Sequence, residues 1–525
     1  MLFSNQQQHE ADGSGSHTIN GDVHDTSSFE SSIPPHPLGI KPLGNKYFSA
    51  CTDARKAIGT FQVLPDEMLA QFLEFLDKRT LRLLGYTCRF LLAHCISDEL
   101  WKSIFLESSS EILLGCHWER AGWPGSDPVT SDSAKQSSFE WLGSWRSTVL
   151  GFAPEQQLRI DCSDVFSDVL HRPFVCSQIS LRRYTSNIPA VNEIDRFEDL
   201  SYAEFAEKWS NTPFVLTKCI QSWPAYKSWS IVTLMKQYSD ISFRAEAVDW
   251  PFSTYCQYML HSSDESPLYL FDRKFAEKMK LEIGKGEGAA YWKPDCFGPD
   301  LFELLGPERP AHRWLIIGPE RSGSTFHKDP NATSAWNAVI QGAKYWIMFP
   351  PSVSVPGVYV SKDSSEVTSP LSIAEWLLEF HAEARQLREC REGICQAGEI
   401  LHVPSGWWHL VVNLEPGIAL TQNFVPKSHL VNVLSFLRDR ADQASGFKKD
   451  ITDPYNLFVD RLRAEDPDLL EDGLRQLAER VQKKRRWELA VGNTGDDDEP
   501  AKKSTGFSFG FGFGDADADD LDEIP

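Results

Sequence analysis

Charged side chains interrupt an otherwise aromatic and apolar stretch at residues 324–351, STFHKDPNATSAWNAVIQGAKYWIMFPP. His327 and Asp329 stand two residues apart, and Lys344 follows fifteen residues after Asp329. Side chains two residues apart on an extended strand share one face, so His327 and Asp329 are expected to point together while Lys328 points away. Such a pair offers one imidazole and one carboxylate to a metal ion.

A third ligand is expected from GEILHVPSGWWHLVVN, at residues 398–413, where a turn interrupts two β-prone runs. This stretch resembles the second motif of the cupin proteins, G-x5-P-x-G-x2-H-x3-N, with its fixed positions at Gly398, Pro404, Gly406, His409 and Asn413. Five matching positions are hard to meet by chance. We therefore predict that His409 completes a metal site with His327 and Asp329, whereas His402 is expected to be a core residue.

The ligand types narrow the metal without fixing it. Two histidines and one carboxylate that leave neighbouring positions open suit non-haem Fe(II), but zinc hydrolases also combine such ligands with an open water position. Lys344 adds a second constraint, because a buried ammonium is costly unless an anion pairs with it. A dicarboxylate such as 2-oxoglutarate meets both needs, since its keto-acid end chelates iron while its distal carboxylate reaches the lysine.

The elements that must position these residues are short strands between residues 191 and 425. Turn residues separate the strands, which favours a barrel or a sandwich. The β-prone runs are PFVLTKC (213–219), SPLYLFD (266–272), RWLIIG (313–318), KYWIMFPP (344–351), EILHVPSGWWHLVVN (399–413) and IALTQNFV (418–425). Helical patterns occur at 372–390, 429–443 and 468–490.

A separate helical unit is predicted at residues 59–106. Pro65 suits a first helical turn, and apolar residues recur at helical spacing in FQVLPDEMLAQFLEFL. A second helix is expected from Thr80 to Cys95, followed by DELWKSIF. The ordered set LPDEML, TCRFLLAHC and ELWKSIF resembles the F-box, which implies docking to the Skp-type adaptor of a cullin ubiquitin ligase. The alternative is a helical hairpin that packs only on its own chain.

Residues 191–425 resemble a jumonji-C (JmjC) 2-oxoglutarate oxygenase. The similarity is highest to the phosphatidylserine-receptor-like branch, described as a lysyl hydroxylase and proposed arginine demethylase. The matching stretches are SPLYLFD, RWLIIGPERSGSTFHKDPNATSAWNAVIQGAKYW, GEILHVPSGWWHLVVN and IALTQNF. This resemblance implies an α+β chain whose core is a double-stranded β-helix, that is, a cupin or jelly-roll barrel, with flanking helices.

The resemblance also implies a role for each site residue. His327, Asp329 and His409 would bind Fe(II), with 2-oxoglutarate as cosubstrate and O2 as oxidant. The residues carried over as cosubstrate contacts are Lys344 and the hydroxyls of Thr421 and Tyr269 at the distal carboxylate, Asn337 near the keto-acid end, and Ser324, where the branch has threonine. Lys328 replaces an apolar residue, and if its face is packed it must extend its ammonium to solvent.

Length and composition set the remaining bounds. We divide the 525 residues into a disordered leader, an F-box, an irregular linker, the JmjC domain, C-terminal helices and an acidic FG-rich tail, at 1–58, 59–106, 107–190, 191–445, 446–490 and 491–525. A net charge of −22 argues against direct nucleic-acid binding and favours basic partners. No apolar run is long enough to span a membrane, and the start lacks a secretory signal, so an intracellular chain is expected.

The leading hypothesis is an Fe(II)- and 2-oxoglutarate-dependent dioxygenase that hydroxylates or demethylates lysine or methyl-arginine side chains of proteins, with histones and RNA-associated proteins as candidates. The alternative is an F-box substrate receptor that uses the barrel as a non-catalytic binding module. A zinc hydrolase would leave Lys344 and Thr421 without a role. KKRR at 483–486 fits a nuclear-import signal or the basic end of a helix. Localisation in the nucleus, and also in the cytoplasm, is expected. The post-barrel helices either pair two chains or cap the barrel.

Overall fold

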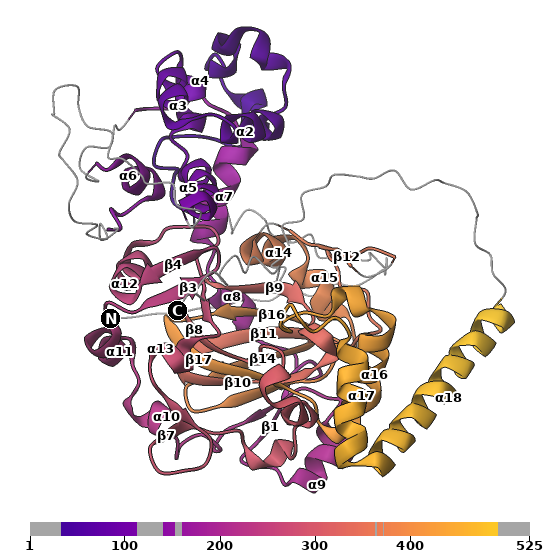
Figure 1. Cartoon of the computed structure of the whole chain (residues 1–525). Coiled ribbons are helices and arrows are strands. Elements are labelled where there is room, and N and C mark those ends of the chain that lie inside the picture. The colour runs from indigo at the N-terminus through magenta and orange to yellow at the C-terminus, as the bar shows by residue number, and fades with distance from the viewer. Residues whose placement is uncertain (1–32, 113–139, 153–159, 363–364, 371, 492–525) are drawn as a thin grey trace, which may run out of the picture. The chain divides into compact units, whose positions relative to one another are not determined.

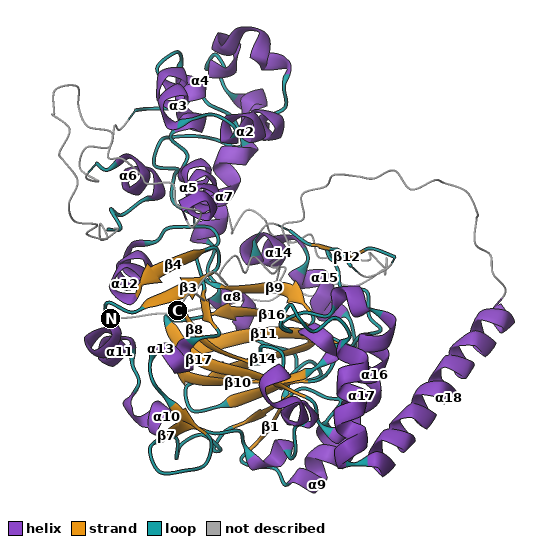
Figure 2. Cartoon of the chain, in the orientation of Figure 1, coloured by secondary structure: helices purple, strands orange, loops and turns teal. Residues whose placement is uncertain are grey.

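The strands of the chain form two main sheets (Figures 1 and 2). The structure, a computed structural model, describes residues 33–112, 140–152, 160–362, 365–370 and 372–491. The strands are β1 (Asp195–Phe197), β2 (Phe214–Leu216), β3 (Ser242–Ala245), β4 (Val248–Pro251), β5 (Leu270–Asp272), β6 (Glu282–Ile283), β7 (Ala289–Tyr291), β8 (Arg313–Gly318), β9 (Gly323–His327), β10 (Ser334–Gln341), β11 (Ala343–Phe349), β12 (Tyr359–Val360), β13 (Val367–Thr368), β14 (Arg391–Gln396), β15 (Ile400–Val403), β16 (Trp408–Asn413) and β17 (Gly417–Phe424).

Non-consecutive strands pair in both sheets. The larger sheet has the order β1-β2-β15-β10-β17-β8-β5-β3-β4, and the smaller has the order β14-β11-β16-β9. All pairs within them are antiparallel except β1 with β2. These crossovers confirm the predicted mixed fold with a cupin barrel.

The central strands are buried on both faces. All six residues of β16 are buried, as are all but one residue of each of β10, β11 and β17. One face of such a strand points into the barrel and the other packs on neighbouring elements, so the sequence has no alternation of polar and apolar residues. A polar side chain in these strands is therefore either paired or part of a site.

Gly323 allows β9 and β16 to approach closely. A Cβ atom at this position would lie 2.0 Å from the carbonyl oxygen of Val411. β9 carries His327 and β16 carries His409, and these two residues are register partners. Close packing at Gly323 thus fixes the distance between the two strands that bear the histidines.

We expect Gly323→Ala to lower the free energy of unfolding by about 3 kcal/mol, because the added methyl group overpacks two paired strands. Gly286→Ala is the matched control, since nothing lies within 4 Å of a Cβ at that position. Urea denaturation monitored by tryptophan fluorescence would measure both variants. Equal urea midpoints in the two variants would show that β9 and β16 accommodate the added methyl group without a loss of stability.

The F-box region contains four α-helices. Leu69 and Leu73 on the first and Leu81 on the second are buried, as the helical spacing predicts. The predicted helix from Thr80 to Cys95 is wrong in one respect, because it is broken at Thr87–Cys88, where Cys88 is extended with φ −159°. The helices are α2 (Asp66–Glu74), α3 (Lys78–Gly85), α4 (Arg89–Cys95) and α5 (Asp98–Ile112).

Residues 33–58 differ from the predicted disordered leader. They include the 3-10 helix η1 (Leu43–Phe48) and the start of η2 (Ala54–Val63), and Ile40 and Ile58 are buried. Asp53 caps η2 by accepting a hydrogen bond from the Arg55 backbone. The Pro, Gly and Ser content suggested disorder, but two isoleucines and one cap supply enough local order. Residues 1–32 lie outside the described part.

Helices also occur where the sequence predicted an irregular linker. Within 107–190 the described residues include the end of α5, α6, α7 and α8. Ser144 caps α6 at its start, Gly151 ends it in the left-handed conformation with φ 71°, and Trp145 is fully buried. The helices from there to the barrel's end are α6 (Trp145–Leu150), α7 (Asp168–Gln178), α8 (Arg182–Thr185), α9 (Tyr202–Glu204), α10 (Pro224–Ser228), α11 (Ile231–Tyr238), α12 (Phe252–His261), α13 (Phe275–Lys278), α14 (Ile373–Glu379) and α15 (His381–Gln386).

Three α-helices follow the barrel in the described part of the chain, α16 (Leu430–Asp439), α17 (Pro454–Glu465) and α18 (Pro467–Val491). They share an apolar core that includes Leu434, Phe458 and Leu477 and that also takes in Phe302. The predicted acidic tail falls almost entirely on residues 492–525, outside the described part. None of the described helices is both long enough and apolar enough to cross a membrane.

Candidate active site

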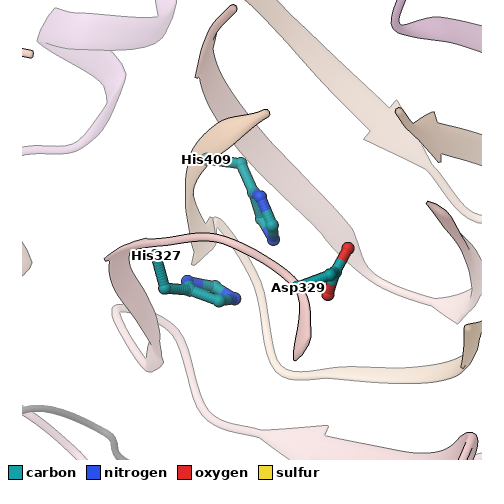
Figure 3. Close-up of side chains that lie close together, drawn as sticks. All are labelled: His327, Asp329 and His409. Carbon is teal, nitrogen blue, oxygen red and sulfur yellow. The ribbon is translucent and has the colours of Figure 1, made fainter. Parts of the chain in front are cut away.

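His327, Asp329 and His409 meet at one point (Figure 3). One ligand atom from each lies within 4.8 Å of the others, and the two imidazole centroids are 4.1 Å apart. His327 ends β9, Asp329 follows it as the N-cap of the 3-10 helix η7 (Pro330–Ala332), and His409 lies on β16. The strand spacing expected for 327 and 329 and the cupin-like motif around 409 thus converge as predicted.

Both histidines are held in one tautomer by the main chain. The Nδ1 atom of His327 lies 2.8 Å from the carbonyl oxygen of Thr325, and that of His409 lies 3.1 Å from the carbonyl oxygen of Trp407. A carbonyl oxygen only accepts, so each Nδ1 must donate. Each Nε2 atom consequently keeps its lone pair for a ligand.

Burial sets the protonation of the cluster. It lowers the pKa of His327 and of His409 to about 4, with a smaller contribution to His327 from His409 itself, so both rings are neutral at pH 7. Burial raises the pKa of Asp329 to about 6, while the interactions with His327 and Asn423 act in the opposite direction. Asp329 Oδ2 is buried without a hydrogen-bond partner among the described residues. Two neutral imidazoles and one unpaired carboxylate oxygen fit a divalent metal ion.

A cavity of about 590 Å³ opens beside the triad. Five of its lining residues are Tyr269, Ser324, Asn337, Trp346 and Thr421. Four of these were predicted from the sequence as cosubstrate contacts: Ser324, Asn337 and Thr421 lie on β9, β10 and β17, and Tyr269 immediately precedes β5. The cavity is large enough for a small dicarboxylate together with part of a larger ligand.

Lys344 lies behind this lining and is only 2% exposed. Its ammonium donates a hydrogen bond to the hydroxyl of Tyr269, which does line the cavity. Burial lowers the pKa of Lys344 to about 7, with only a small opposing effect from Cys395. Because burial disfavours the charged form of Lys344, a bound anion would restore that charge, which indicates an anion-binding position next to Tyr269.

The other predicted contacts differ in how far they are already paired. The hydroxyl of Thr421 donates to the carbonyl oxygen of Trp336 at 3.0 Å, whereas the side-chain oxygen of Asn337 is buried without a partner among the described residues. The indole nitrogen of Trp346 is in the same state. Asn337 therefore needs a donor, and Trp346 an acceptor, from whatever occupies the cavity.

His402 and four tryptophans between residues 336 and 408 differ in whether they line the cavity. His402 is fully buried between Phe205, Phe214 and Phe297, which confirms the core assignment. Of Trp336, Trp346, Trp407 and Trp408, only Trp346 lines the cavity. Lys328 is exposed, and its ammonium lies 4.5 Å from the ring centroid of Trp408. It makes a cation–π contact there, so the lysine between the two ligands needs no apolar packing.

Part of the cavity was missed by sequence reasoning. The hairpin β3–β4 supplies Arg244 and Asp249, and the stacked pair Phe271 and Trp314, with centroids 5.3 Å apart, forms an aromatic side. No motif marks the hairpin. RWLIIG was predicted as a strand, but which of its residues face the cavity depends on the barrel's register, which the sequence alone does not show.

Two family models match the chain, one described as cupin-like domain over residues 242–429 and one as F-box-like over residues 61–107. With the His–Asp–His cluster inside the barrel, they define an F-box protein with a JmjC cupin domain. The chain belongs to the JmjC family of iron- and 2-oxoglutarate-dependent oxygenases.

Three similar proteins illustrate the range of that family. The Arginine-specific demethylase JMJ22 of Arabidopsis thaliana is 35% identical over 446 residues, which cover 80% of this chain and 82% of that protein. The Bifunctional arginine demethylase and lysyl-hydroxylase psr-1 of Caenorhabditis elegans is 35% identical over 42% of this chain and 57% of its own length. The 2-oxoglutarate and iron-dependent oxygenase JMJD4 of Danio rerio is 31% identical over 36% and 45%, respectively.

Proposed function

We propose that this oxygenase hydroxylates or demethylates basic side chains of proteins, namely lysine or methylated arginine. The observation that carries the proposal is one cavity lined by a His–Asp–His cluster and an aromatic side, with Lys344 reaching it from behind through Tyr269. The names of the similar proteins, which include arginine demethylase and lysyl-hydroxylase, support the same substrate class.

His327, Asp329 and His409 would hold Fe(II), and Lys344 would pair with the distal carboxylate of 2-oxoglutarate. Bound Fe(II) supplies the chemistry by which O2 converts 2-oxoglutarate to succinate and CO2 and oxidises a substrate C–H bond. Around it, the Tyr269 hydroxyl would donate to the distal carboxylate, and the Thr421 hydroxyl would do so by exchanging its bond to the Trp336 carbonyl oxygen. Asn337 and Ser324, which line the same cavity, would contact the keto-acid end. The protein's part is to orient these groups and exclude side reactions.

The aromatic side favours a basic substrate. Phe271 and Trp314 stack with an interplanar angle of 29°, and both line the cavity. A lysine or guanidinium side chain gains about 0.5–2 kcal/mol over such a ring. The nearby carboxylates contribute less, because Asp249 pairs with Arg244 and Asp272 pairs with Lys278.

The first test measures succinate released from 2-oxoglutarate by purified protein with Fe(II) and O2, with and without a core-histone mixture. An increase with histones that is absent in Asp329→Ala supports the proposal. Formaldehyde and loss of a methyl group indicate demethylation, whereas a peptide that gains one oxygen indicates hydroxylation. If the full-length protein binds 2-oxoglutarate but neither histones nor a basic nuclear extract stimulates succinate release, the proposed substrate class is wrong.

Lys344 gives 2-oxoglutarate binding a specific pH dependence. The pKa of Lys344 in the protein without ligand is about 7. A bound carboxylate stabilises the charged form, so binding of 2-oxoglutarate takes up a proton above pH 7. The affinity is therefore expected to fall by about tenfold per pH unit above pH 7. Calorimetry with the Mn(II)-loaded protein at several pH values checks this. The affinity for 2-oxobutyrate, which lacks the distal carboxylate, should show no such slope. Parallel pH slopes for the two compounds would exclude Lys344 as the partner of the distal carboxylate.

We also propose that the F-box binds a Skp-type adaptor. Large apolar side chains are exposed there rather than buried, with Val63 at 81%, Phe75 at 84% and Tyr86 at 71%, together with Met68 and Leu83. A surface of this kind marks a protein interface. The F-box-like match supports the kind of partner.

Co-purification with a Skp-type adaptor tests this interface. Phe75→Asp should abolish adaptor binding. Leu260→Asp, at a similarly exposed apolar residue on α12, should not. The oxygenase and receptor roles are separable, because His327→Ala should leave adaptor binding intact and Phe75→Asp should leave succinate release intact. Adaptor binding that survives Phe75→Asp would exclude this surface.

We further infer localisation in the nucleus, and also in the cytoplasm. Lys483, Lys484, Arg485 and Arg486 are all exposed on α18, where an import receptor can reach them. Fluorescence imaging of a variant with these four residues changed to glutamine would show nuclear depletion. A separate proposal is that the C-terminal helices pair two chains. Sedimentation of the unaltered protein and of the same purified variant would measure whether each is a dimer.

A further inference from the structure

A short segment after the barrel forms part of the cavity. We call Ala444–Phe447 the wall segment. It lies between the 3-10 helix η9 (Ala441–Gln443) and α17. Its middle residues, Ser445 and Gly446, line the cavity. Its outer residues, Ala444 and Phe447, pack against the apolar core of the C-terminal helices. The segment thus joins that core to the site.

Asn331 connects the wall segment to the loop that carries Asp329. Its side-chain nitrogen donates to the Ser445 carbonyl oxygen at 2.9 Å, and the Ser445 backbone nitrogen donates to its side-chain oxygen at 3.0 Å. Asn331 is only 2% exposed. Two reciprocal bonds in a buried position define one geometry, because breaking them leaves buried polar groups unpaired.

The backbone of Asn331 explains why asparagine stands there. Its φ of 55° and ψ of 23° lie in the left-handed region, which asparagine adopts more readily than most residues. This conformation turns the side chain away from the strand direction and toward the wall segment. Residue type and backbone shape are therefore matched at this position.

The wall segment is also held by a second contact, with Ala311. The Ala311 backbone nitrogen donates to the Gly446 carbonyl oxygen at 2.8 Å. Gly446 has φ 75°, and a Cβ atom there would lie 3.2 Å from the Ala311 nitrogen. Ala311 lines the cavity as well. Barrel residues thus hold the segment at two adjacent positions.

We propose that Ala444–Phe447 is a substrate-facing wall of the cavity and that Asn331 is the residue that positions it. The C-terminal helices then help to determine which side chain is admitted, in addition to the barrel. This inference rests on the proposed function for the identity of the ligand as a protein substrate.

The test uses Asn331→Gly in the full chain, because glycine keeps the left-handed backbone and removes both side-chain bonds. Asn187→Gly is the matched control, since Asn187 is exposed and also has a positive φ, of 57°. Gly446→Ala perturbs the same segment from the Ala311 side. Each variant is compared by amide hydrogen exchange, Mn(II) affinity, 2-oxoglutarate affinity and the histone concentration that gives half-maximal succinate release.

Asn331→Gly should accelerate exchange in residues 444–447 by about tenfold or more. The half-maximal histone concentration should rise about threefold or more, while Mn(II) and 2-oxoglutarate affinities stay within about twofold. Gly446→Ala should shift the same two readouts, and Asn187→Gly none. Solvent-water proton relaxation by bound Mn(II), which needs no substrate, should rise in both wall variants as the cavity opens.

Unchanged exchange in Asn331→Gly would overturn the positioning role. A loss of Mn(II) affinity parallel to the other changes would instead assign Asn331 to the loop that carries Asp329. Faster exchange with unchanged water relaxation would mean that the segment does not close the cavity. If histones do not stimulate succinate release by the unaltered protein, the proposed substrate is wrong. Amide hydrogen exchange and water proton relaxation then test separately whether Asn331 positions the wall segment at the cavity.

Discussion

Asp329→Ala is expected to reduce succinate release to background and to weaken Mn(II) binding by at least about 100-fold. Loss of an outer hydrogen-bonding partner of a metal ligand already costs about 10–100-fold, and this substitution removes a ligand itself. The fold should survive, because Asp329 is a buried carboxylate whose pKa is raised by burial and whose Oδ2 has no partner among the described residues. Calorimetric titration with Mn(II) and the succinate assay measure the two effects.

The control for this variant is Asp240→Ala, at an exposed aspartate. It should bind Mn(II) like the unaltered protein. Thermal unfolding in the presence of EDTA separates lost metal binding from lost structure. Retained Mn(II) affinity in Asp329→Ala would mean that the triad is not the metal site.

Lys344→Met is expected to weaken 2-oxoglutarate binding by about 100-fold or more. Hydrogen bonds to a charged group contribute about 1.5–3 kcal/mol, and leaving one member of a buried ion pair alone costs about 3–5 kcal/mol. Methionine keeps the length and the apolar stem of lysine, so the loss reports the charge. Calorimetry with the Mn(II)-loaded protein measures it, and Mn(II) affinity itself should not change.

The same variant should have an altered pH dependence of stability without ligand. Burial lowers the pKa of Lys344 from 10.5 to about 7, so the unfolded chain binds more protons in that interval and the free energy of unfolding rises with pH there. Lys344→Met should lose that rise. Urea denaturation between pH 7 and 10 checks this sign, and an identical pH profile in both proteins would show that Lys344 is not desolvated.

The candidate metal site was predictable because each part of it follows a local sequence pattern. His327 and Asp329 follow from the two-residue periodicity of a strand, and His409 from a spaced motif whose glycines and proline form a turn. Lys344 followed from the cost of a buried cation. The three triad residues lie together in the structure, although they are spread over 83 positions from 327 to 409, and Lys344 lies behind the lining of the same cavity. Strong local constraints therefore carried most of the prediction.

The parts that were missed depend on distant contacts. Asn331 reads as an ordinary turn residue, and only its partner Ser445, 114 positions away, gives it a function. Phe271 and Trp314 were assigned to strands, yet their shared orientation follows from the pairing of β5 with β8. The residues at 33–58 looked disordered because their composition is polar, while their order comes from a few buried contacts.

The tautomer of both candidate metal-binding histidines is set by the peptide backbone, at Thr325 and Trp407, and by no side chain among the described residues. A carbonyl group is present whatever amino acid occupies those two positions. Random mutation can therefore change the neighbours of the site without altering which imidazole nitrogen faces the metal. Such robustness leaves the surrounding cavity free to diverge toward new substrates while the metal-binding chemistry is inherited unchanged.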